Sequence, residues 1–159
     1  MNNAGNILYK KIEEITEEEF DDIFATNVKG LFFCCQQAAK KMADGGKIVN
    51  ISSSVTKLML PTYGAYAATK GAVEQLTKVL AKELGPKKIA VNSILPGPTD
   101  TELFRQGKTD EQIKFLANMA AFSRIATPDD IANAVELLLS NEASWITGQN
   151  ICANGGFIA

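Results

Sequence analysis

The sequence contains no histidine, only three cysteines and no long apolar run. The absence of histidine excludes Ser-His-Asp and Cys-His catalysis and removes the commonest zinc ligand. Cys34 and Cys35 are adjacent and Cys152 is distant, an odd number without metal-ligand spacing, so we read them as small core residues and expect no metal site. Any catalytic acid or base must therefore be Tyr, Lys, Asp or Glu.

Positive charge is also scarce. The 16 Lys and Arg residues are scattered and are outnumbered by 18 Asp and Glu residues, which argues against nucleic acid and anionic membranes as partners. No apolar run reaches the roughly 18 residues of a membrane span, and Met1-Asn2-Asn3 does not resemble a signal peptide. We expect a cytoplasmic protein.

Strands and helices alternate along the 159 residues, of which 46% are hydrophobic, as in one globular domain. Such alternation predicts an α/β fold with a parallel sheet, whose ligands bind at the carboxyl ends of the strands. Strands are predicted over residues 47–51, 89–95 and 149–153. Helices are predicted from Thr16 to about Met42, about Tyr63 to Leu84, 109–119, and Thr127 to about Leu139.

Two tyrosines stand at the start of the long helix. Tyr66 and Lys70 share a helix face at i and i+4, whereas Tyr63 has Ala67 in that position. A nearby ammonium lowers the pKa of a phenol, as a proton donor working near neutral pH requires. The pair alone is better explained by chance neighbours on an exposed helix. Asn27, on the apolar stripe of the first helix, is either a satisfied core amide or a functional group.

Five motifs, which occur in a defined order along the chain, favour functional roles for Tyr66, Lys70 and Asn27 over these structural explanations. They are "NNAG" (2–5), "TNVKG" (26–30), "VNISS" (49–53), "YAATK" (66–70) and "NSILPG" (92–97), and the pattern continues through "WITGQNICANGG" (145–156). Together they resemble the compact short-chain dehydrogenase/reductase family. The resemblance implies a doubly wound, Rossmann-like parallel sheet, of which residues 1–159 would be the C-terminal catalytic portion.

The resemblance also implies roles for individual residues. Tyr66 would exchange the proton with the substrate, Lys70 would lower its pKa and hold the nicotinamide ribose, and Ser53 would position the substrate oxygen. Asn27 would anchor a water of the proton relay, while Ser52 and Ser54 would be turn residues. The implied cofactor contacts are Asn3, Ala4, Gly5, Tyr66, Lys70, Pro96, Gly97 and Thr101.

The implied function is an oxidoreductase that uses NAD or NADP to interconvert a small-molecule ketone and a secondary alcohol. A homodimer or homotetramer is implied for the full-length protein. A sugar-nucleotide epimerase or dehydratase, which also keeps Y-x-x-x-K, is a further alternative. Substrate choice would depend on the loop 98–124, where Phe104, Phe115, Leu116 and Met119 form an apolar lid or merely cover the core.

The chain departs from the family at its start. The strand, T-G-x-x-x-G-x-G turn and helix that precede "NNAG" in the family are not in this sequence. We expect a truncated gene model, ahead of a fragment that needs a partner or a domain without redox activity. The alternative function is a catalytically silent fragment or oligomerisation subunit. We expect strand 48–51 to form an apolar edge, and the chain alone to self-associate and not to bind NAD or NADP.

Overall fold

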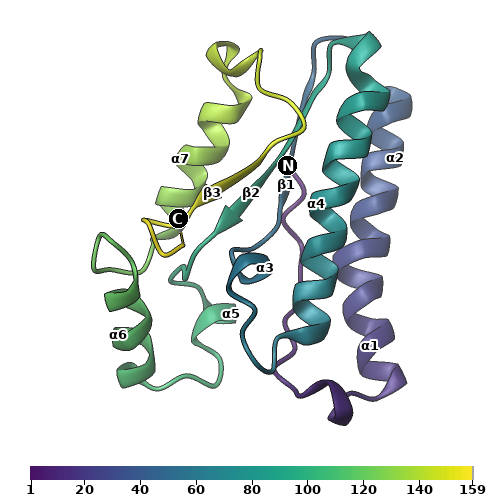
Figure 1. The fold of residues 1–159 in the computed structure, drawn as a ribbon. Coiled ribbons are helices and arrows are strands. Elements are labelled where there is room, and N and C mark those ends of the chain that lie inside the picture. Colours follow the sequence, from purple (N-terminus) through teal and green to yellow (C-terminus); the bar gives the residue numbers. More distant parts are fainter. Residues whose placement is uncertain (159) are drawn as a thin grey trace.

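The computed structural model of the protein describes residues 1–158. Its three strands form one parallel sheet in the order β1-β2-β3 (Figure 1). The register places Val49 opposite Asn92 and Ile94 opposite Ile151. The strands are β1 (Lys47–Ile51), β2 (Ala90–Pro96) and β3 (Asn150–Ala153). The predicted parallel α/β architecture is therefore confirmed.

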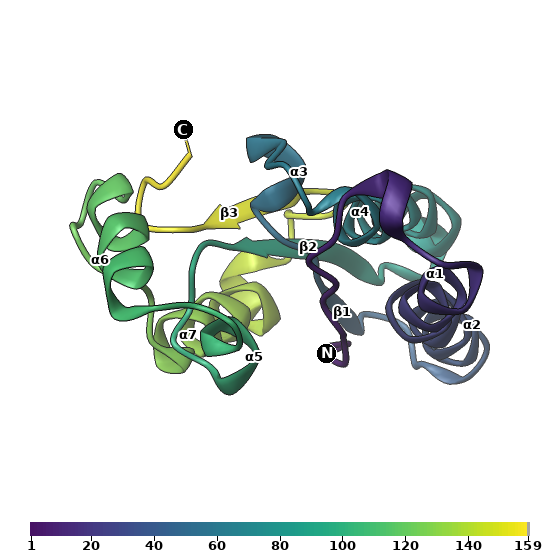
Figure 2. The same ribbon diagram turned by 90° about the horizontal axis from the view of Figure 1, so that it is seen from below.

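Helices cover both faces of this sheet (Figure 2). The helix α7 (Pro128–Leu139) packs on one face, and α4 (Gly64–Leu84) packs on the other, with α1 (Glu17–Phe24) and α2 (Leu31–Lys41) beside it. The shorter helices are α3 (Val55–Leu58), α5 (Glu102–Arg105), α6 (Asp110–Met119), and single turns at Ile12–Glu14, Gly85–Lys87 and Asn141–Ala143. None of the helices within residues 1–158 is long and apolar enough to cross a membrane.

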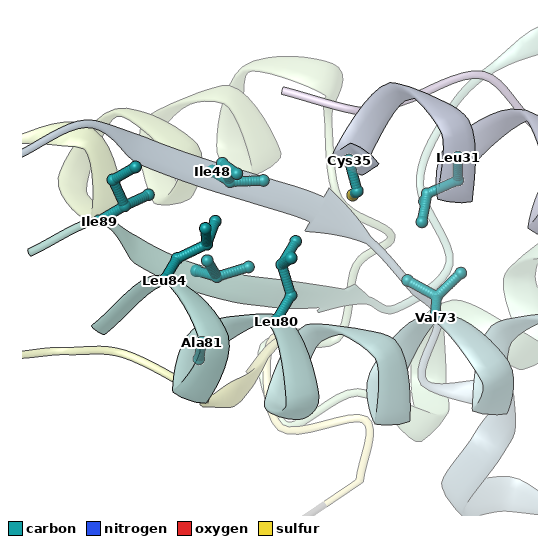
Figure 3. Close-up of a cluster of buried hydrophobic side chains, with 9 residues drawn as sticks. Leu31, Cys35, Ile48, Val73, Leu80, Ala81, Leu84 and Ile89 are labelled. Atoms are coloured by element: carbon teal, nitrogen blue, oxygen red, sulfur yellow. The ribbon is translucent and has the colours of Figure 1, made fainter. Parts of the chain in front are cut away.

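Two hydrophobic clusters, one on each face, hold the layers together. The first joins β1 and β2 to α2 and α4 (Figure 3), and the second joins the three strands to α7. Their most buried members include Val91, Cys35 and Val73 in the first cluster and Ile94 and Val49 in the second. Because apolar surface is buried on both sides, the sheet is doubly wound as expected.

The N-terminal residues lie against the outer edge of β1. Asn2 forms a parallel bridge with Asn50, in which the Asn2 N–H donates to Val49 O (2.9 Å) and the Ile51 N–H donates to Asn2 O (3.1 Å). Ile48 and Val49 are 4% and 1% exposed because helices cover both faces of the strand. The strand β1 is therefore the expected apolar edge of the three-stranded sheet, met at one point by Asn2, but its Ile48 and Val49 side chains are buried.

The first long helix begins as expected but is not regular throughout. Thr16 and Glu19 form the predicted capping box. Between α1 and α2, however, the backbone is a π-helix, η2 (Ala25–Gly30), and Asn27 is its buried residue. Such insertions widen one turn and are frequent at functional sites.

The long helix α4 has the predicted length, and its buried face carries polar as well as apolar residues. Val73 and Leu80 are buried in the first cluster, whereas Val79 is 55% exposed. The buried face also carries Thr69, Lys70, Glu74 and Thr77. Apolar periodicity therefore indicates only part of the buried face of this helix.

A buried amide network connects the N-terminal residues, β1 and α4. The Asn50 side chain is fully buried, accepts from Asn2 Nδ2 (2.8 Å) and donates to Thr77 Oγ1 (3.0 Å). Thr77 Oγ1 in turn donates to Val73 O (2.8 Å). Each polar group in this chain of contacts is thereby satisfied away from water.

We predict that Asn50→Ala lowers the free energy of unfolding by about 2 kcal/mol, because it leaves the Asn2 amide and the Thr77 hydroxyl without their buried partner. Urea denaturation followed by circular dichroism measures the change. Asn118→Ala, on the exposed side of α6, is the control and should change stability by less than about 0.5 kcal/mol. Equal effects of the two substitutions would contradict a structural role for the network.

Candidate active site

A cavity of about 660 Å³ opens where β1 and β2 end. Its walls include the segment after β1 with Ser53, the first turns of α4 with Tyr66 and Lys70, and the segment after β2 with Thr101. All the predicted cofactor contacts line it, namely Asn3, Ala4, Gly5, Tyr66, Lys70, Pro96, Gly97 and Thr101. The structure thus brings the predicted residues to one place, except for Asn27, which lies behind the wall.

The Ser53 and Tyr66 hydroxyls face each other in this cavity. Burial raises the pKa of the Tyr66 phenol, and a hydrogen bond with the Ser53 side chain opposes that rise. The Val55 N–H donates to Ser53 Oγ (3.3 Å) and orients it. Ser52 and Ser54 are buried and donate to Lys70 O and Leu95 O, both at 3.1 Å, so their hydroxyls serve the fold as expected of turn residues.

Lys70 lies one helical turn after Tyr66. Its side chain is buried, its Nζ donates to Ile51 O (3.0 Å), and the same atom lies 5.6 Å from the centroid of the Tyr66 ring. Burial lowers the pKa of Lys70 from 10.5 to about 8. The lowered Tyr66 pKa expected from this neighbour is not found here, because desolvation of the phenol is the largest effect on its pKa and raises it.

Asn27 holds the N-terminal segment against α4. Its Oδ1 accepts from the Asn6 N–H (2.7 Å), and its Nδ2 donates to Asn6 O (2.8 Å) and to Thr69 Oγ1 (3.1 Å). Gly5 packs into the resulting corner: a Cβ there would lie 3.3 Å from Asn27 Oδ1 and 3.5 Å from Lys70 Nζ. The absence of a side chain at residue 5 therefore lets the N-terminal segment lie this close to Asn27 and Lys70.

A second glycine shapes the opposite wall. A Cβ on Gly97 would lie 3.0 to 3.2 Å from atoms of Asn154, whose amide is held by Ile158 O (3.0 Å) and whose Oδ1 accepts from the Gly156 N–H (3.0 Å). The turn after β3 thus packs tightly against the end of β2. Phe157, in the same turn, lines the cavity.

The loop after β2 is divided between the cavity and solvent. Phe104 and Leu116 line the cavity, whereas Phe115 is 67% and Met119 is 39% exposed. The four residues therefore do not form one lid. Leu103 also lines the cavity.

Several lining residues carried no sequence signal. Tyr9 belongs to an irregular segment, Leu58 ends α3, and Leu60 lies in the short connection before α4. In that connection Met59 (φ 51°) and Thr62 (φ 71°) adopt left-handed backbone angles, which β-branched residues such as threonine rarely do. The strained turn fixes where Tyr63 begins the helix.

The cavity therefore combines a phenol, a hydroxyl and an ammonium with apolar walls. Phenol and hydroxyl can both donate to one carbonyl oxygen, and the ammonium can stabilise the phenolate that remains after proton transfer. Within residues 1–158 no group of three or more His, Cys, Asp or Glu side chains is placed to hold a metal ion.

Sequence comparisons match almost the whole chain to known proteins. The family described as enoyl-(acyl carrier protein) reductase matches residues 1–158. A short-chain type dehydrogenase/reductase of Picea abies is 39% identical over 98% of this chain and 59% of its own length. An NADPH-dependent aldehyde reductase-like protein of Arabidopsis thaliana, described as chloroplastic, is 40% identical over 98% of this chain and 60% of its own length.

Solved protein structures also match the fold of this chain. The angucycline C-6 ketoreductase LanV with bound NADP matches with a TM-score of 0.91 and 40% identity over 98% of this chain and 60% of its own. A Serratia marcescens short-chain dehydrogenase/reductase matches with a TM-score of 0.92 and 36% identity over 99% and 64%. This chain spans about 60% of the length of the relatives it matches. The chain belongs to the short-chain dehydrogenase/reductase family.

Proposed function

We propose that the protein containing this chain is an NAD(P)-dependent oxidoreductase that interconverts a ketone and a secondary alcohol. The observation that carries the proposal is the meeting of Ser53, Tyr66 and Lys70 in one cavity at the carboxyl ends of the strands. The names of the relatives, an aldehyde reductase-like protein and a ketoreductase, support carbonyl chemistry.

In the reducing direction, Tyr66 donates its proton to the carbonyl oxygen as hydride reaches the carbonyl carbon. A phenol is protonated near neutral pH, and because burial raises the pKa of Tyr66, release of its proton requires that the phenolate be stabilised. Ser53 donates to the same oxygen and orients the carbonyl. Lys70, an ammonium below a pH of about 8, stabilises the phenolate left behind, and the reverse steps oxidise the alcohol.

The nicotinamide cofactor, NAD or NADP, supplies or accepts the hydride. Its nicotinamide half is assigned to this cavity, because the residues that the family resemblance implies for cofactor contact, Gly5 and Gly97 among them, line it. Among the described residues the buried Lys70 ammonium has one protein acceptor, Ile51 O, and so keeps donors for ribose hydroxyls. The two relatives named with NADPH and NADP support a nicotinamide cofactor.

Asn27 contributes through its backbone. Its side-chain amide is engaged by Asn6 and Thr69, so a relay water near this residue would contact the main chain. The π-helical turn at Ala25–Gly30 departs from the regular α-helical bonding pattern there. We assign Asn27 both the positioning of Gly5 and the water contact.

The alternative remains a catalytically silent fragment or oligomerisation subunit. It is favoured by the exposed aromatic side chains of α1 and α2, since Phe20, Phe32 and Phe33 are 43%, 45% and 49% exposed and such surface promotes association. A homodimer or homotetramer and a cytoplasmic location stay predictions for either function.

We predict that Tyr66→Phe nearly abolishes turnover while cofactor binding changes little, because only the donated proton is removed. The assay follows nicotinamide absorbance with a ketone, in a version of the protein that also carries the glycine-rich segment. A loss of about 100-fold or more is expected. Tyr63→Phe is the control and should retain most of the turnover. If Tyr63→Phe were the more damaging change, the choice of Tyr66 would be wrong.

We predict that Lys70→Met stabilises the fold at pH 7 by about 2 kcal/mol, after allowance for the lost hydrogen bond to Ile51 O. The unfolded chain holds this proton up to its ordinary pKa of 10.5, whereas the folded chain releases it at about 8. The free energy of unfolding of the wild type therefore rises relative to that of the variant as the pH increases from 8 to 10.5. Urea denaturation at both ends of this range measures the difference, and a constant difference would refute a buried charge.

We predict that a polypeptide of these 159 residues binds NADH and NADPH only weakly, because it holds no T-G-x-x-x-G-x-G turn for the pyrophosphate. Titration followed by nicotinamide fluorescence should show dissociation constants above about 1 mM. Micromolar binding of either dinucleotide would show that the nicotinamide side suffices, and would argue against the silent-fragment alternative.

A further inference from the structure

Two tyrosines that the proposed chemistry does not use lie beside Tyr66. The ring centroids of Tyr9 and Tyr63 are 5.0 Å apart at an interplanar angle of 80°, and those of Tyr63 and Tyr66 are 6.4 Å apart at 62°. All three residues line the cavity. We call Tyr9 and Tyr63 the aromatic wall, which leads from the surface to the reacting hydroxyl.

The aromatic wall is held from both ends. The Lys10 N–H donates to Thr62 O (2.9 Å), which joins the segment of Tyr9 to the strained turn before Tyr63. Lys108 Nζ donates to Tyr9 Oη (2.7 Å) and to Phe104 O (2.9 Å), and lies 4.3 Å from the Tyr9 ring centroid. The ring positions are therefore set before a ligand arrives, and the Lys108 charge is already engaged.

Large apolar side chains make up much of the remaining cavity lining. They are Leu58, Leu60, Leu103, Phe104, Leu116 and Phe157. Among the cavity-lining residues of the described chain, Lys70 has the only charged side chain, and it is bonded to Ile51 O beside Gly5. A charged substrate would lose its hydration here without a free partner, so a neutral one is favoured.

We propose that the substrate is a neutral ketone attached to a flat aromatic ring system, with the ring against Tyr9 and Tyr63 and the carbonyl oxygen at Ser53 and Tyr66. The position of the carbonyl rests on the proposed function, whereas recognition of the ring requires only the aromatic wall. Edge and face contacts with aromatic side chains favour a flat ring over a saturated one beyond the effect of buried area.

Binding without cofactor tests this choice, because it needs no turnover. Methyl naphthyl ketone, its saturated counterpart methyl decalinyl ketone, and naphthoate are titrated into the purified chain by isothermal titration calorimetry. Decalin is the more hydrophobic ring system, so a merely apolar cavity would prefer the saturated ketone. We expect the aromatic ketone to bind about fivefold more tightly than the saturated one, and more tightly than naphthoate.

Substitutions in the aromatic wall then locate the preference. Tyr63→Leu should remove most of the fivefold ratio, whereas Tyr63→Phe, which keeps the ring, should preserve it. Tyr9→Leu gives a second measurement should Tyr63→Leu unfold, as judged by circular dichroism. Ratios of affinities are compared, so a general loss of binding in one variant does not imitate the effect.

The outcomes are separable from those of the proposed function. The proposal of an aromatic substrate would be overturned if the two ketones bound equally, if the saturated one bound more tightly, or if neither bound. It would also be overturned if the affinity ratio were unchanged in both leucine variants. Tighter binding of naphthoate would show that Lys70 forms an anion site and would overturn the proposal that the substrate is neutral. Aromatic preference together with absent turnover would reject the oxidoreductase proposal and retain the ring-binding wall.

Discussion

The buried amide of Asn27 joins three segments on which the site depends. It bonds both backbone groups of Asn6 and the hydroxyl of Thr69, and that hydroxyl donates to Tyr66 O (2.7 Å). The N-terminal segment, the π-helical turn and the first turns of α4 are thereby fixed relative to one another. An aliphatic residue at this position would leave the Asn6 N–H and C=O without these protein partners. The hydrogen bonds of this amide thus fix the relative positions of the three segments, which a non-directional apolar contact would not do.

In contrast to the Asn27 amide, the buried charge of Lys70 lowers the stability of the fold, and we relate it to the proposed function. Its ammonium is buried with one protein acceptor among the described residues, and its pKa falls to about 8, so the folded state carries the cost of its charge near neutral pH. Nearby Asn50 and Thr77 satisfy each other at no such cost. A charged group retained where a neutral one would be more stable is typical of active sites.

The elements that could be predicted from sequence are those set by local rules. The capping box at Thr16 and the strand at 47–51 follow from short-range chemistry. The buried polar residues of α4 could not be predicted, because Glu74 accepts from Ser52 Oγ (3.0 Å) and Asn150 Nδ2 (3.3 Å) in the interior, partners that only the tertiary fold supplies. The π-helical turn depends on Asn6 and Thr69 in the same way.

The candidate site also has residues that local sequence rules predict and residues whose positions depend on tertiary contacts. Ser53, Tyr66 and Lys70 lie in motifs with fixed spacing, and helical periodicity alone brings the last two together. Tyr9 reaches the cavity through an irregular segment whose course is set by contacts with Thr62 and Lys108, far away in sequence. The proposed reacting groups Tyr66 and Lys70 are thus held by the long helix α4, whereas Tyr9, proposed to contact the substrate, is held by an irregular segment. Chemistry and selectivity can then vary independently, since a change in the Tyr9 segment leaves the α4 register that sets Tyr66 over Lys70 untouched.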